Sequence, residues 1–290
     1  MGYGTLPDEP EFGAGAEVAP TVAPLSDRAP PVVPSATTAA AANAHVAYLL
    51  RQADDRLVLG HRLSEWCGHA PILEEDIALA NIALDLVGQA ALLLEHAGAI
   101  EGAGRSADQL AYLRDATEYR NVQLVELPKG DFAVTIVRQF LFSALQVPLL
   151  ELLERSADPT LAGIAAKARK ECTYHLRHTA DWMLKLGDGT DESHARAQAA
   201  LDLLWPYAHE LLWGDGVDDA MVAAGIAVDV RTMGPAFRSN VDRVLQAATL
   251  TLPVDGWKPV GGRTGRHTEH LGHLLAEMQI LARSHPGASW

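Results

Sequence analysis

Apolar residues recur with the three- and four-residue spacing of α-helices from about Ala44 to the end of the chain. Strand-like alternation of apolar and polar residues is not found, so we predict an all-α helical bundle. The clearest repeat lies in the second predicted helix, where the apolar residues that we expect to form the bundle seam are Ile77, Ala80, Leu84, Val87, Ala91 and Leu94.

Capping and breaking residues give the helix boundaries. Asp158-Pro159 is typical of a helix start, with the acid as cap and proline at the first helical position. Pro148 is expected to kink or end the helix that contains it. Helices are predicted over residues 45–68, 74–97, 106–120, 131–155, 158–186, 190–213, 230–250 and 265–284.

The first 43 residues differ from the rest of the chain. They contain seven of the 16 prolines, together with much Ala, Gly and Val. Such a composition buries little apolar surface, so we predict a disordered tail over residues 1–43 and a helical domain over residues 44–290.

Composition and charge exclude several classes of protein. Lys and Arg number 23 against 37 Asp and Glu, so the net charge of −14 disfavours binding to nucleic acid. Two cysteines, Cys67 and Cys172, exclude a disulfide scaffold and a cysteine-based metal site. We see neither an apolar run of membrane-spanning length nor a basic region followed by an apolar stretch, so a soluble cytoplasmic protein is expected.

Polar residues inside apolar helices raise the question of a metal site. Di-iron bundles need a Glu from each of two helices and Glu-x-x-His from each of the other two. Four of the predicted helices each contain a polar line, which is a set of polar residues along one side of the helix. The four lines are Asp54, His61 and Glu65; Asn81, Asp85 and Gln89; Gln139, Ser143 and Gln146; and Glu171, His175 and His178.

Two tests for a di-iron centre fail. Residues 132–150 contain no carboxylate, and none of the 12 histidines has Glu three residues before it. Two interpretations remain open: Glu65, Asp85, Glu171 and His175 bind metal in a reduced set, or they form a paired buried network. We predict the network, with no catalytic, cofactor-binding or metal-binding residue on this chain.

Other candidate sites are weaker. His267, His270 and His273 are predicted on one face of the last helix, where they would bind zinc or nickel or form a solvated or partner-facing stripe. Asp55 and Arg62 are expected to pair. The sequence contains no phosphate-binding glycine loop.

Long ordered motifs resemble a bacterial family. They include LVLGHRLSEWCGHAP at 57–71, LEEDIALANIALDLVGQ at 73–89, GDFAVTIVRQF at 130–140, YHLRH at 174–178, LGDGT at 186–190 and HTEHLG at 267–272. From about Ala44 to Trp290 the chain resembles the PaaC (PaaI) family of structural subunits of phenylacetyl-CoA monooxygenase, the ring 1,2-epoxidase of aerobic phenylacetate breakdown.

The resemblance implies a ferritin-like fold with additional C-terminal helices and a non-catalytic role. In this family a homologous PaaA-like catalytic subunit carries the di-iron centre and binds phenylacetyl-CoA. A small third subunit completes the oxygenase, and a reductase with flavin and a [2Fe–2S] cluster supplies electrons from NADPH. The alternative is a stand-alone ferritin-like metal oxidase or oxygenase with a reduced ligand set, and a ferritin-like storage or binding protein is a third possibility.

Overall fold

The computed structural model describes residues 36–288, which contain helices and turns but no strand. The prediction of an all-α protein is confirmed. Of the predicted tail, residues 1–35 lie outside the described residues. Residues 36–43 belong to the first helix, so the helical domain begins eight residues before its predicted start at residue 44.

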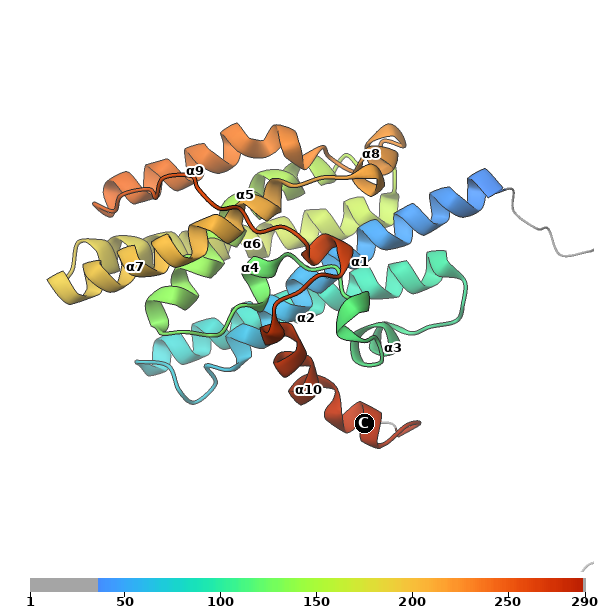
Figure 1. Cartoon of the computed structure of the whole chain (residues 1–290), viewed down its shortest axis with the longest axis horizontal. Coiled ribbons are helices and arrows are strands. Elements are labelled where there is room, and N and C mark those ends of the chain that lie inside the picture. Colours follow the sequence, from blue (N-terminus) through green and yellow to red (C-terminus); the bar gives the residue numbers. More distant parts are fainter. Residues whose placement is uncertain (1–35, 289–290) are drawn as a thin grey trace, which may run out of the picture. The chain divides into compact units, whose positions relative to one another are not determined.

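Four long helices form the body of the fold, consistent with a ferritin-like bundle. They are α1 (Ala36–Ser64), α2 (Leu73–Glu101), α5 (Phe132–Leu153) and α6 (Pro159–Gly187). α1 and α2 run in opposite directions and pack mainly on each other, as do α5 and α6, whereas α2 and α5 run in the same direction (Figure 1). Residues 102–131 return the chain along the bundle between α2 and α5, and one face of each long helix is directed toward a common interior.

Shorter elements surround the long helices. The predicted helix at 106–120 is broken into α3 (Ala107–Tyr112) and a 3₁₀ turn, and α4 (Gln123–Glu126) lies between the predicted helices 106–120 and 131–155. Beyond α6 come α7 (Asp191–Ala208), α8 (Gly216–Ala223), α9 (Gly234–Ala247) and α10 (Glu269–Ser284). In Figure 1, α9 and α10 lie on opposite sides of the body.

The predicted start of α6 is confirmed in atomic detail. Oδ1 of Asp158 accepts hydrogen bonds from the backbone N–H groups of Thr160 and Leu161, at 2.9 and 3.1 Å. These bonds satisfy two of the donors that the first turn of a helix leaves without an intrahelical partner.

Pro148 neither ends nor breaks α5, which continues to Leu153. A proline within a helix deprives the carbonyl four residues earlier, here that of Ala144, of its usual donor. The side-chain amide of Asn240 in α9 donates to that carbonyl at 3.0 Å. A distant helix therefore satisfies the acceptor that the proline leaves free.

The predicted seam of α2 is mostly wrong, since Leu94 is the one predicted residue that is buried. Three of its residues, Ile77, Leu84 and Ala91, are exposed, and the buried face carries Leu79, Ile82, Ala83, Leu86, Ala90, Leu93 and Ala97. Because α2 is apolar on nearly all sides, spacing alone could not identify the inward face. The outward apolar residues Leu73, Ile77, Leu84 and Ala91 are called the α2 outer row below.

Two helices, α2 and α5, are long and apolar enough to cross a membrane by length and composition, contrary to the prediction that no such run exists. Most of the apolar window of α5 is buried inside the chain (83%), as in the core helix of a folded domain. The corresponding window of α2 is only 44% buried, because the α2 outer row faces away from the bundle.

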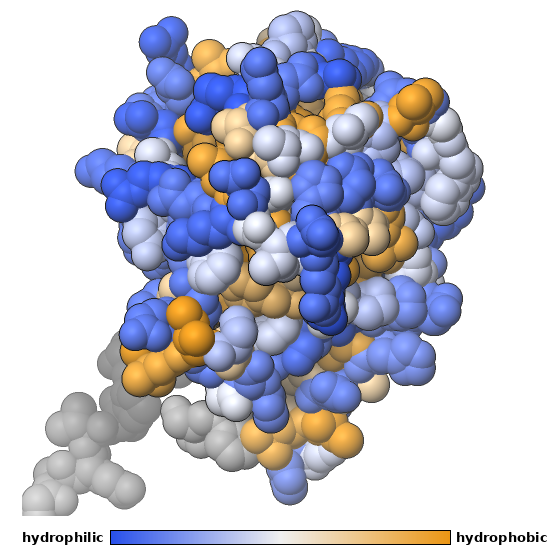
Figure 2. All heavy atoms as spheres, turned by 90° about the vertical axis from the view of Figure 1, so that its left-hand side faces the viewer, coloured by the Kyte–Doolittle hydropathy of each residue, from blue (hydrophilic) through white to orange (hydrophobic). Residues whose placement is uncertain are grey.

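Figure 2 views the body from the left-hand side of Figure 1, where the turn between α6 and α7 lies. Hydrophilic residues cover most of this face, with smaller hydrophobic clusters between them. Scattered exposed apolar residues are normal on protein surfaces. The α2 outer row differs from them because its members follow one side of a single helix.

Candidate functional site

Arg56 of α1 occupies the interior that the four long helices share. The residue is 2% exposed, and no ion pair joins its guanidinium to a carboxylate within the described chain. Its neighbours are the side-chain oxygens of Gln89 in α2 and Gln146 in α5, at 3.0 and 2.7 Å, and the backbone oxygen of Gln52 at 2.8 Å. Burial lowers the pKa of Arg56.

Gln89 extends this network to the fourth helix. Its amide nitrogen donates to Oε2 of Glu171 in α6 at 2.8 Å, while its oxygen accepts from Arg56. Side chains from α1, α2, α5 and α6 thus meet in one connected set. Gln89, Gln146 and Glu171 were predicted to lie on inward polar lines, whereas Arg56, which joins them, was missed.

This interior does not fit a di-metal centre. Such a centre needs several anionic carboxylates to balance the metal charge. Here the middle of the bundle holds a cation surrounded by neutral amide oxygens. The cavity lined by Gln52, Arg56 and apolar residues of α2, α5 and α6 has a volume of only about 10 Å³. We therefore derive no oxygen chemistry from these residues.

The four residues proposed for a reduced metal set are each engaged in a pair. Asp85 accepts from Nε2 of His175 at 2.9 Å, and Glu171 accepts from Gln89. Glu65 pairs at 2.6 Å with Arg62 of its own helix. In the described part of the chain, three metal-ligating side chains converge at His45, His96 and Asp158, a group that includes none of these four residues.

Asp85 and His175 form a pair between α2 and α6. Burial alone would lower the pKa of His175, whose side chain is fully buried. Hydrogen bonding to Asp85 and the nearby Cys172 outweigh burial and raise this pKa to about 9. The raised pKa favours the imidazolium form of His175, whose pair with Asp85 links α2 to α6.

Buried charges of α1 connect the bundle to the segments around it. Asp55 pairs with Arg263 at 2.8 Å, so the prediction that Asp55 pairs with Arg62 is wrong. Asp54 pairs with Arg114 at 2.5 Å, and Arg51 binds Asp215 and Asp218 at 2.7 Å each. A single turn of α1 thereby anchors chain segments more than 50 residues away. Partners so distant could not be identified from helical spacing.

The predicted histidine stripe is not formed, because His267 precedes α10 and lies off its face. Its Nδ1 lies 2.7 Å from the buried carboxylate of Glu126, and its Nε2 lies 3.0 Å from the carbonyl oxygen of Tyr119. His267 thus anchors the segment before α10, while His273 is exposed.

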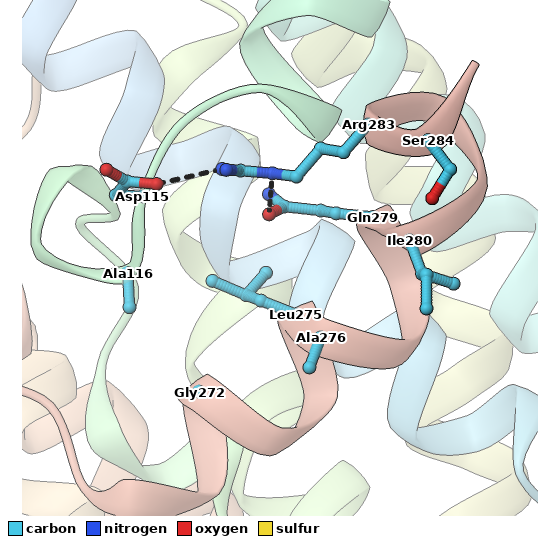
Figure 3. A pocket seen from close by; sticks show the side chains of 9 residues that line it. All are labelled: Asp115, Ala116, Gly272, Leu275, Ala276, Gln279, Ile280, Arg283 and Ser284. Carbon is cyan, nitrogen blue, oxygen red and sulfur yellow. Dashed lines mark hydrogen bonds and ion pairs between the residues drawn. The ribbon is translucent and has the colours of Figure 1, made fainter.

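A pocket with a volume of about 420 Å³ lies on the surface beside α10. Arg283 spans its rim, donating to Gln279 at 3.0 Å and to Asp115 at 2.9 Å (Figure 3). The remaining lining is mostly small or apolar, including Leu275, Ala276 and Ile280. Since its one cationic group is already paired, the pocket presents no set of groups for acid–base or nucleophilic chemistry.

Comparison with known proteins places these features in a family. The family described as phenylacetic acid catabolic protein matches residues 32–290 of the chain. The C subunit of the 1,2-phenylacetyl-CoA epoxidase of Escherichia coli (strain K12) is similar to it, with 48% identity over 248 residues. That alignment covers 86% of this chain and 100% of the relative.

Proposed function

This chain belongs to the phenylacetic acid catabolic protein family, and we propose that it is the non-catalytic C subunit of a cytoplasmic 1,2-phenylacetyl-CoA epoxidase. In this role it supports a homologous catalytic subunit that carries the di-iron centre, and takes part in the aerobic breakdown of phenylacetate. The observation that carries the proposal is the 48% identity to the E. coli relative, which is matched over its whole length. The flavin, the [2Fe–2S] cluster and the NADPH site belong to the reductase.

The interior of the bundle supports a structural role. Arg56 and its amide partners fill the region in which a di-metal carboxylate protein would hold its ions. Asp85, His175 and Glu171 are used in pairs that join α2 to α6. These contacts keep the shape of the bundle without supplying a metal site, so oxygen activation is assigned to the partner subunit.

The α2 outer row supports a large protein partner. Leu73, Ile77 and Leu84 are exposed by 72%, 53% and 69%, and with Ala91 they extend along about 27 Å of one helix side. Exposed apolar side chains gathered along one side of a helix are typical of a surface that another protein covers. The relative is by name one subunit of a multisubunit enzyme. We propose that the catalytic subunit covers this row.

Iron analysis and activity test the assignment together. The chain purified alone should contain far less than one iron per chain and should not oxidise phenylacetyl-CoA with NADPH and the reductase. Co-expressed with the catalytic subunit and the small third subunit, it should co-purify with them, and the complex should form the epoxide. About two irons on the isolated chain, with turnover, would instead establish the stand-alone oxidase.

A further inference from the structure

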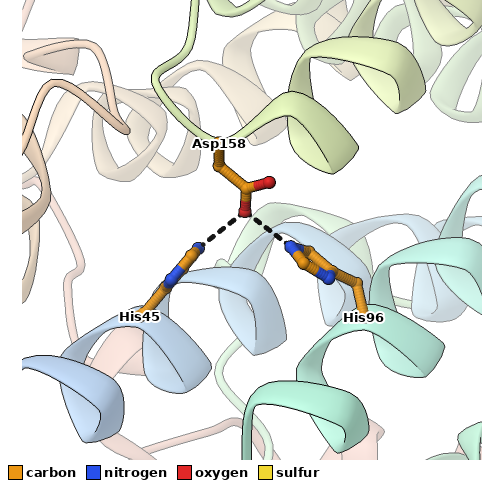
Figure 4. A group of neighbouring side chains, drawn as sticks. All are labelled: His45, His96 and Asp158. Carbon is orange, nitrogen blue, oxygen red and sulfur yellow. Dashed lines mark hydrogen bonds and ion pairs between the residues drawn. The ribbon is translucent and has the colours of Figure 1, made fainter.

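Three potential metal ligands converge at the end of the bundle where α1 enters and α6 begins. Nε2 of His45 in α1 and Nε2 of His96 in α2 both point to Oδ2 of Asp158, the residue preceding α6 (Figure 4). The nitrogen-to-oxygen distances are 3.0 and 2.5 Å, and all three ligand atoms lie within 4.8 Å of one another. These three residues are not part of the polar network around Arg56 in the middle of the bundle.

We propose that His45, His96 and Asp158 bind one divalent transition-metal ion of the zinc class, with water as the fourth ligand. Two imidazoles and one carboxylate form a donor set suited to zinc and its neighbours and ill suited to calcium or magnesium. The two imidazole rings are nearly perpendicular, with an interplanar angle of 87°, so their nitrogens approach from different directions.

The spacing of the ligand atoms is close to what such an ion requires. Metal–ligand distances near 2.0 to 2.1 Å place tetrahedral ligand atoms about 3.4 Å apart. The two observed nitrogen-to-oxygen distances are shorter than that, so ion binding would move these atoms apart by less than about 1 Å. Small side-chain rotations are sufficient for that change.

The surroundings orient the ligands. Oδ1 of Asp158 accepts two backbone hydrogen bonds from the first turn of α6, which fixes the carboxylate and leaves Oδ2 directed at the histidines. Hydrogen bonds of this kind commonly hold metal-binding carboxylates in place.

One histidine of the group has a buried nitrogen that lacks a partner. Nε2 of His45 lies near Oδ2 but makes no well-directed hydrogen bond, and it is shielded from solvent. A bound cation would satisfy this nitrogen and would join α1, α2 and α6 at one point.

Zinc binding by the full-length chain, purified without a histidine tag and treated with a chelator, tests the inference independently of the epoxidase assignment. Calorimetry with Zn²⁺ should give one tight equivalent per chain, and Co²⁺ should give the visible absorption of a four-coordinate ion. His96→Gln and Asp158→Asn should each weaken binding more than about tenfold. Asparagine still caps a helix, so Asp158→Asn retains the fold.

His178→Gln is the matched control, because His178 of α6 forms a similar pair with Glu75 of α2 at 3.0 Å. It should bind Zn²⁺ like the unmodified chain. Zn²⁺ should also raise the melting temperature of the unmodified chain but not that of Asp158→Asn. The proposal is overturned if the unmodified chain binds no equivalent of Zn²⁺, or if His96→Gln and Asp158→Asn bind it unchanged.

Discussion

Nη2 of Arg56 donates a 2.7 Å hydrogen bond to Oε1 of Gln146, joining α1 to α5 across the middle of the bundle. Gln89 accepts from the same guanidinium and donates to Glu171, so the contact extends to α2 and α6. A polar network in a protein interior stabilises the fold only while every member keeps a partner. The first prediction follows from that condition.

Replacing Arg56 by methionine keeps much of the side-chain length but removes the donors. The oxygens of Gln89 and Gln146 then lose the donor they share, at a cost of about 1 to 3 kcal/mol for each unsatisfied group. We expect urea denaturation to show a loss of about 2 to 4 kcal/mol in the free energy of unfolding.

A triple variant distinguishes the network from simple packing. Arg56→Met combined with Gln89→Leu and Gln146→Leu replaces the polar set as a whole, and it should recover most of the lost stability. A single Arg56→Met variant as stable as the unmodified protein would show that the network contributes nothing.

The imidazolium of His175 makes stability depend on pH. Its pKa of about 9 in the folded chain lies above the ordinary value of 6.5. The resulting stabilisation is complete below pH 6.5 and is lost as the pH rises through about 9. Asp85 is partly exposed, so solvent screening reduces the effect to the order of 2 kcal/mol.

The comparison with His175→Gln isolates this contribution. The difference in unfolding free energy between the unmodified chain and the variant should be largest near pH 6 and should shrink by pH 10. Other groups that titrate in this range are common to both proteins. A difference that does not change with pH would contradict the assignment of an imidazolium at this position.

Gly187 at the end of α6 tolerates no side chain. A Cβ atom built there would lie 2.0 Å from the carbonyl oxygen of Ala248, so α6 and the end of α9 would have to separate. Gly187→Ala should lower the free energy of unfolding by about 1 to 3 kcal/mol.

Gly163 of the same helix is the matched control, because it is exposed and a Cβ there meets nothing within 4 Å. Gly163→Ala should raise stability by about 0.5 to 1 kcal/mol, since alanine is the better helix former. Thermal and urea unfolding of the two variants measure the contrast. Equal effects would show that the close approach of Gly187 to Ala248 is not maintained in solution.

Leu84 is the most informative residue of the α2 outer row. Leu84→Glu places a charge in the middle of the row, and it should abolish co-purification of the catalytic subunit. The variant should remain folded, because Leu84 is already exposed and exposed substitutions change stability by about 0.5 kcal/mol or less.

Leu203→Glu provides the comparison, since Leu203 is 56% exposed on α7, away from the row. This variant should still co-purify with the catalytic subunit. Retention of the partner by Leu84→Glu, or its equal loss from both variants, would argue against the α2 outer row as the docking face.

The sequence by itself determined the fold class and most helix boundaries, because these depend on local signals. The spacing of apolar residues requires no knowledge of neighbouring helices, and neither does the cap at Asp158-Pro159. The lack of a Glu-x-x-His motif and of a carboxylate within residues 132–150 is likewise a property of residue types and spacings alone.

Only the tertiary structure determines which way each buried side chain points and which residue it contacts. Which side of α2 faces outward depends on the positions of α1 and α6. The helix α5 continues through Pro148 because Asn240 of α9 donates to the carbonyl that the proline leaves free. Arg56, Asp55 and His45 find their partners 30 to more than 200 residues away along the chain. Helical periodicity describes one helix at a time, so it contains no information about such contacts.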